Sequence, residues 1–113
     1  MSAVKFEVKK YQVTLGGDLP SIVSDNDTKV CGIIGCYGGG YQLMINFVEE
    51  GDKIPAPLYN ENSHVGSIYI SGCKINTFID LLRNEKPIFA YLNSEKPEWC
   101  NISTSHEAVG EGE

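Results

Sequence analysis

The stretch that decides the fold is V-C-G-I-I-G-C-Y-G-G-G-Y-Q-L-M-I-N-F-V, residues Val30 to Val48. It is typical of two antiparallel strands joined by a glycine turn. Apolar side chains recur at every second position of its second half, which predicts one buried strand face formed by Tyr41, Leu43, Ile45 and Phe47. The triplet Gly38-Gly39-Gly40 can adopt positive φ without a steric penalty, so the chain can reverse there. We therefore expect this hairpin at the centre of the sheet.

The length and charge of the chain limit the classes of protein to consider. Its 113 residues are enough for one domain with its own core, which we expect over residues 1–106. The net charge is −6, from 15 Asp and Glu against 9 Lys and Arg, which argues against a nucleic-acid partner. We identify no secretory leader and no apolar run of membrane-spanning length, so the sequence predicts a cytoplasmic protein without a membrane partner.

The segment from Val4 to Leu15 reads as a strand whose apolar pattern changes phase. The apolar residues move from the even positions Val4, Phe6 and Val8 to the odd positions Tyr11, Val13 and Leu15. Because strand side chains alternate strictly between two faces, a flat strand cannot bury both sets on one side. Two explanations remain open: a bulge or bend near Lys9-Lys10, or a second half that is buried on both faces.

One amphipathic helix is predicted in the second half of the chain. Its apolar stripe recurs at i, i+3, i+4 and i+7 and consists of Ile75, Phe78, Ile79 and Leu82. Short connections place this helix across the strands expected at Val65–Ile70 and Ile88–Leu92. We therefore expect Phe78 and Leu82 to be nearly fully buried, with Asp80 on the opposite, exposed side.

The remaining segments complete an α+β fold. We expect a short strand at Ser21–Val23, an extended proline-containing loop at Ile54–Ser63 and a return strand at Trp99–Thr104. Residues 107–113 form an acidic, glycine-rich tail, for which disorder is the default expectation. The predicted architecture is a mostly antiparallel, curled sheet of about five to seven strands with one helix packed on it. One helix cannot cover both sheet faces, so either the sheet curls toward a barrel or its open face meets another subunit.

No complete catalytic set is evident in the sequence. The glycines at 38–40 are followed by Tyr-Gln and not by the Lys-Ser or Lys-Thr of a phosphate-binding loop. The four cysteines lack the spacing of a zinc site and are expected to be reduced in the cytosol, so we predict no metal and no cofactor. Single candidates remain for acid–base or nucleophilic chemistry: His64, His106, Cys73 (expected at the start of the helix), Asp80 and Glu98.

Aromatic side chains form a second group of candidates. Tyrosine combines an apolar body with a polar tip, which suits interfaces and ligand pockets, although it also simply favours strands. The candidates for ligand or interface contacts are Tyr37, Tyr41, Tyr59, Tyr91 and Trp99.

Two long stretches carry a resemblance to a known group of proteins. These are I-D-L-L-R-N-E-K-P-I-F-A-Y-L-N-S-E-K-P-E-W-C-N-I-S-T, from Ile79 to Thr104, and the central C-Y-G-G-G-Y-Q-L-M-I. Together with the closing V-G-E-G-E, they resemble small uncharacterised bacterial proteins carried in integron gene cassettes. The resemblance implies a bacterial origin. It implies no established activity and no catalytic residues.

These observations lead to a functional expectation with two alternatives. We expect a non-enzymatic binding or interaction module, homodimeric through the open sheet face, with a small molecule or another protein as a further partner. One alternative is a small cofactor-free enzyme of the isomerase or hydrolase type, with its site between the sheet and the Ile54–Ser63 loop. The other is a metabolite-binding protein with an aromatic pocket.

Overall fold

The computed structural model describes residues 3–19 and 28–104. The elements in chain order are β1 (Ala3–Glu7), β2 (Lys10–Leu15), β3 (Val30–Gly38), β4 (Tyr41–Val48), β5 (Leu58–Asn60), β6 (Val65–Ser71), η1 (Gly72–Lys74), α1 (Ile75–Asn84), β7 (Ile88–Asn93), η2 (Pro97–Trp99) and β8 (Asn101–Thr104). The expected strand at Ser21–Val23 and the tail over 107–113 lie outside the described residues. No helix in the described part of the chain has the length and apolarity needed to cross a membrane.

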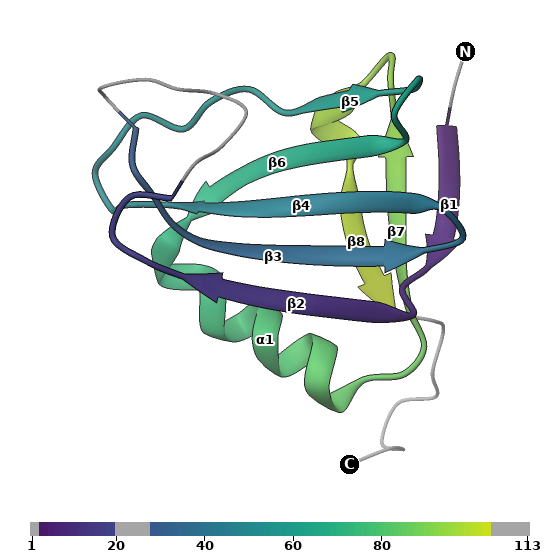
Figure 1. Cartoon of the computed structure of the whole chain (residues 1–113), viewed down its shortest axis with the longest axis horizontal. Coiled ribbons are helices and arrows are strands. Elements are labelled where there is room, and N and C mark those ends of the chain that lie inside the picture. The colour runs from purple at the N-terminus through teal and green to yellow at the C-terminus, as the bar shows by residue number, and fades with distance from the viewer. Residues whose placement is uncertain (1–2, 20–27, 105–113) are drawn as a thin grey trace.

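The strands form two sheets (Figure 1). The large sheet has the order β2-β3-β4-β6-β5, and the small sheet has the order β1-β7-β8. Within these sheets β4 and β6 run parallel, and all the other neighbouring strands are antiparallel. Figure 1 shows the small sheet crossing behind the large one at a steep angle. The mostly antiparallel α+β class with one α-helix is confirmed, but the strands are divided between two sheets, and neither closes into a barrel.

The predicted central hairpin is confirmed as β3 and β4. Gly39 and Gly40 form its turn with φ of 58° and 86°, a region that disfavours any side chain with a Cβ atom. The alternation in β4 buries Leu43, Ile45 and Phe47 completely, on what we call the inner face of the large sheet. Side chains of the small sheet, including Leu92, and the helix pack against this inner face and complete the core.

The phase change in the N-terminal strand is the point where the chain passes from one sheet to the other. The Val8 N–H donates to the Ile88 carbonyl of the small sheet, and the next N–H, that of Lys9, donates to the Tyr37 carbonyl of the large sheet, both at 2.8 Å. The predicted bend near Lys9 is therefore present. The alternative of a doubly buried second half is wrong, because β2 is a largely exposed edge strand in which Leu15 is 67% exposed.

The helix α1 covers the inner face beside the small sheet. The Phe78 ring packs edge-on against the Phe47 ring of β4, with centroids 5.4 Å apart. Ile75 packs directly on Gly32 of β3. A Cβ atom at residue 32 would collide with the Ile75 side chain, so this contact depends on the glycine. These contacts correct the expected position across β6 and β7: the apolar stripe packs on β3 and β4. Leu82 is buried as predicted, but Phe78 is only half-buried.

Two further expectations need correction. The extended loop at Ile54–Ser63 contains a short strand, β5, which pairs with β6 through Leu58 and Tyr59. The return strand begins at Asn101 rather than at Trp99, because Pro97–Trp99 forms a turn of 3-10 helix. Both elements are short, so neither has the length of pattern from which a strand or helix can be recognised.

We predict that Gly38→Ala destabilises the fold by about 1–3 kcal/mol, because an added Cβ atom would collide with the backbone carbonyl of Glu7 where the two sheets meet. Gly17→Ala is the matched control, since its Cβ atom would meet nothing within 4 Å, and we expect a change within about 0.5 kcal/mol. Urea unfolding of both variants measures the difference. Equal midpoints would contradict this close approach of the two sheets.

Candidate functional site

The acid–base candidates do not come together. His64 is exposed at the start of β6, where its ring stacks on that of Tyr41 with centroids 4.7 Å apart. Asp80 is exposed on α1 and Glu98 is exposed in η2. No hydrogen bond, ion pair or ring contact joins any two of these three side chains. His106 lies outside the described residues. The described candidates therefore offer single groups at the surface and not a catalytic pair.

Burial separates the four cysteines, and none of them forms a disulfide. Cys36 is completely buried, and burial raises its pKa to about 12. Burial also raises the pKa of Cys100. Cys31 is half-buried and donates to the Phe47 carbonyl at 3.3 Å. Cys73 is exposed in η1, just before α1, with its sulfur 3.3 Å from the Ser71 hydroxyl.

These environments determine which chemistry the thiols can perform. The thiolate is the reactive form, so a buried thiol with a raised pKa is inert at neutral pH. Cys73 is accessible, but among the described residues its hydrogen-bond partner is Ser71 and not a His, Asp or Glu that could act as a base. No group of three or more His, Cys, Asp or Glu within residues 3–19 and 28–104 is arranged to hold a metal ion.

We predict that iodoacetamide at about pH 8 alkylates Cys73 first and leaves Cys36 unmodified until the protein unfolds, because the Cys36 thiol is buried and its pKa lies well above that pH. Peptide mass spectrometry over a time course identifies the modified residues. Cys73→Ser should remove the fast reaction. Modification of Cys36 at the rate of Cys73 in the folded protein would contradict the assigned burial.

The five aromatic candidates do not gather at one place, although Tyr41 and Tyr59 both belong to the inner face of the large sheet. Tyr41 lies between the rings of Phe6 and His64, and the pKa of Tyr59 in β5 is raised first by burial and then by Tyr41. Tyr37 points to the opposite face of the large sheet. The other two lie outside the large sheet: Tyr91 of β7, whose hydroxyl accepts from Asn93 at 2.9 Å, and Trp99, which is 56% exposed in η2. They do not line a common pocket.

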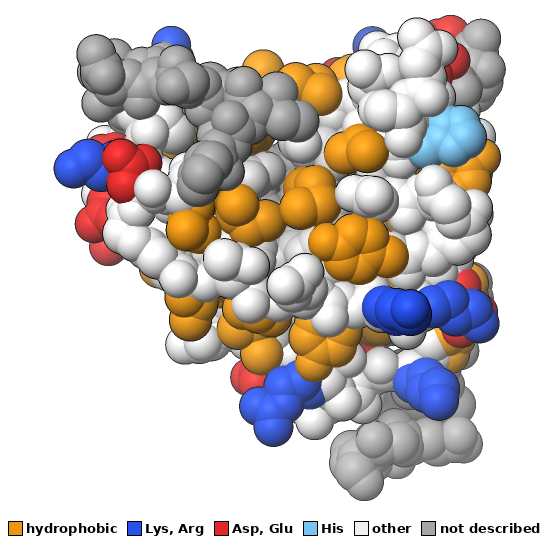
Figure 2. Space-filling view, viewed as in Figure 1, with side chains coloured by type: hydrophobic (Ala, Val, Ile, Leu, Met, Phe, Trp, Pro, Cys, Tyr) orange, Lys and Arg blue, Asp and Glu red, His pale blue; other side chains and the backbone are white. Residues whose placement is uncertain are grey.

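The large sheet has an outer face, opposite α1 and the small sheet, that carries almost no charge. The strand registers place half-buried apolar side chains across its middle: Ile33, Tyr37, Met44, Leu58 and Val65. Neutral polar side chains surround them: Gln12, Thr14, Gln42 and Asn60. Figure 2 views this face and shows apolar side chains gathered across it, with carboxylates at the margins. Lys10 is the single charged residue among the described strand residues of this face.

Two details of the outer face set it apart from the core. The ring of Tyr37 occupies the space that a side chain at Gly35 would fill, so it lies along β3. Ser67 and Tyr69 of β6 also belong to this face, and their buried hydroxyls have no hydrogen-bond partner. In the part of the chain that the structure describes, no other buried side-chain polar atom lacks a hydrogen-bond partner. Internal hydrogen bonding is therefore incomplete on this face.

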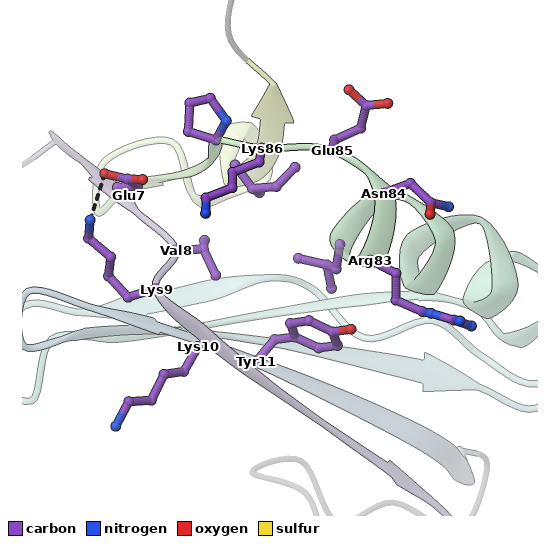
Figure 3. A pocket seen from close by; sticks show the side chains of 12 residues that line it. Glu7, Val8, Lys9, Lys10, Tyr11, Arg83, Asn84, Glu85 and Lys86 are labelled. Carbon is purple, nitrogen blue, oxygen red and sulfur yellow. Dashed lines mark ion pairs between the residues drawn. The ribbon is translucent and has the colours of Figure 1, made fainter. Parts of the chain in front are cut away.

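A cavity of about 560 Å³ opens on another side of the molecule, where the junction between β1 and β2 meets the end of α1 (Figure 3). Residues 7–11 and 82–88 line it. The cavity includes Lys9 and Lys10, together with Arg83 and Lys86. No sequence signal could have joined these two groups, because they are more than seventy positions apart and only the fold brings them together.

Comparison with known proteins finds no family model, no curated protein and no solved structure that matches this chain.

Proposed function

We propose that this protein is a non-enzymatic interaction module that forms a homodimer through the outer face of the large sheet. The observation that carries the proposal is the apolar, carboxylate-free surface centred on Met44 and Tyr37. Apolar patches rimmed by neutral polar groups are typical of protein–protein contacts. The comparisons neither support nor contradict the resemblance to integron cassette proteins, so the proposed function rests on the structure alone.

The charge distribution favours a second copy of this chain as the partner. Two protomers that each carry a net charge of −6 repel one another over most orientations. The outer face lacks carboxylates among its described strand residues, so apposing it with its own copy brings together the least repulsive surfaces. A twofold dimer uses the same patch on both subunits, and neutral amides such as Gln12 and Gln42 can pair with themselves across such an axis.

The size of the face indicates a weak dimer. Five strands about 4.8 Å apart and about seven residues long give a face of roughly 24 by 23 Å. The free area is at most on the order of 550 Å², because Leu19 already packs on Val48 and Tyr69 at one end of this face. Stable interfaces bury about 800 Å² per partner, so this surface lies at the low end. We therefore expect association that depends on concentration in the micromolar range or above.

The placement of the polar candidates favours this module over the small enzyme. An enzyme of this size needs a base or nucleophile inside a cleft, and His64, Asp80 and Glu98 are all exposed and separate. The cavity at the end of α1 is lined by none of the described candidates, which are His64, Cys73, Asp80 and Glu98. An aromatic pocket formed by all five candidates would require Tyr37, Tyr91 and Trp99 to meet Tyr41 and Tyr59, and the fold places these three elsewhere.

We predict that sedimentation equilibrium shows an average mass rising with concentration toward twice that of the 12.4 kDa protomer. The double variant Gln12→Glu/Gln42→Glu, isosteric and exposed on the outer face, should remain a monomer because four carboxylates would then meet across the twofold axis. The control Asn76→Asp/Thr77→Glu adds the same charge on α1 and should leave the dimer intact.

Two results would contradict the proposed dimer. One is a monomer for the unmodified protein at concentrations of several hundred micromolar. The other is equal weakening by the outer-face and α1 variants, which would mean that total charge and not this surface controls association. Circular dichroism of each variant should match the unmodified protein, since all four positions are exposed.

A further inference from the structure

The cavity at the end of α1 concentrates positive charge on an acidic protein. Four of the nine Lys and Arg residues of the chain line it, against two carboxylates; the cations are Lys9, Lys10, Arg83 and Lys86, and the carboxylates are Glu7 and Glu85. The lining therefore carries a net charge of +2 on a chain whose net charge is −6. Such a local reversal of sign attracts anions to this one place.

Most of this positive charge is not neutralised by the described residues. Lys9 forms an ion pair with Glu7, with 3.0 Å between Nζ and Oε1. Lys10, Arg83 and Lys86 form no ion pair with another described residue. Figure 3 shows the Lys86 side chain directed into the space above Val8, whereas the side chains of Glu85, Lys10 and Arg83 point away from this space. An anion inside the cavity would thus meet an ammonium group first.

The floor of the cavity is apolar. Val8 and Leu82 line it together with Ile88, which is 4% exposed, so its lower part offers hydrocarbon contacts. Tyr11 forms one wall; it is 38% exposed, and Figure 3 shows its ring on the side where Arg83 lies. A volume of about 560 Å³ lies within the range of small-molecule sites, and an aromatic wall beside a guanidinium suits a planar ring bearing a negative group.

We propose that this cavity binds a small aromatic carboxylate or sulfonate, with its ring on the apolar floor and its anionic group at Lys86, in the positive field of the other cations that line the cavity. A purely structural role explains part of the charge, since cations near the last turn of α1 complement the negative end of the helix dipole. It does not explain Lys9 and Lys10, which come from the strand side, or the apolar floor beneath the cations. The site lies at the end of α1 and does not depend on the proposed dimer.

The test uses the full chain and two fluorescent probes with the same aromatic body. One is 8-anilinonaphthalene-1-sulfonate, and the other is N-phenyl-1-naphthylamine, which lacks the sulfonate. We expect saturable binding of one sulfonate per chain, affinity that falls as salt rises from about 0.02 M to about 0.5 M, and weaker binding of the neutral probe.

The variants locate the site. Arg83→Gln/Lys86→Gln should raise the dissociation constant of the sulfonate at least about fivefold, while binding of the neutral probe stays unchanged. Lys29→Gln/Lys74→Gln removes the same charge from exposed positions outside the cavity and should leave both probes unaffected. Absence of saturable sulfonate binding, equal affinity for the two probes, or equal loss in both variants would each overturn the proposal.

Discussion

Two consecutive backbone N–H groups, those of Val8 and Lys9, donate to carbonyls in two different sheets, and the architecture depends on this junction. Because neighbouring amides point in opposite directions along an extended chain, one residue can serve the small sheet while the next serves the large one. The switch reverses which parity faces inward. It also brings Glu7 against Gly38, at a distance that only glycine allows. The core then lies between two sheets that cross, and the helix fills the remaining inner surface.

The same junction separates the two surfaces that carry the functional arguments. On one side of it the large sheet runs outward, and its outer face, which Leu19 partly covers at the end where Val48 and Tyr69 lie, has few charges. On the other side the chain passes the end of α1, and the lysines of the junction meet Arg83 and Lys86 around an apolar floor. Crossing sheets leave such a corner unfilled because neither sheet nor helix extends into it. The cavity is therefore a consequence of the packing geometry and not of a dedicated loop.

Local patterns allowed much of the secondary structure to be predicted. The period-two pattern of Leu43, Ile45 and Phe47 and the helical stripe ending at Leu82 both correspond to observed elements. Which strands pair, and where the helix packs, was not predictable. Periodicity shows which face of an element is apolar but not which element lies beside it. The parallel pairing of β4 with β6, the division into two sheets and the position of α1 on β3 and β4 all belong to this category. Candidate residues chosen by chemical type, such as Asp80, proved to be solvated surface groups, whereas the cationic cavity depends on segments that meet only in the fold.

The pairing of β1 with β7 has a consequence for synthesis on the ribosome. Phe6 of β1 lies opposite Ala90 of β7, so β1 cannot pair until β7 has been synthesised. The β3–β4 hairpin can form as soon as it emerges, but the partners of its apolar inner face are encoded up to 45 positions later. At translation rates of about 5–20 residues per second, that face stays uncovered for roughly 2–9 seconds. The nascent chain thus passes through a stage in which Leu43, Ile45 and Phe47 are available to chaperones or to neighbouring chains, and this stage ends only when β7 leaves the exit tunnel.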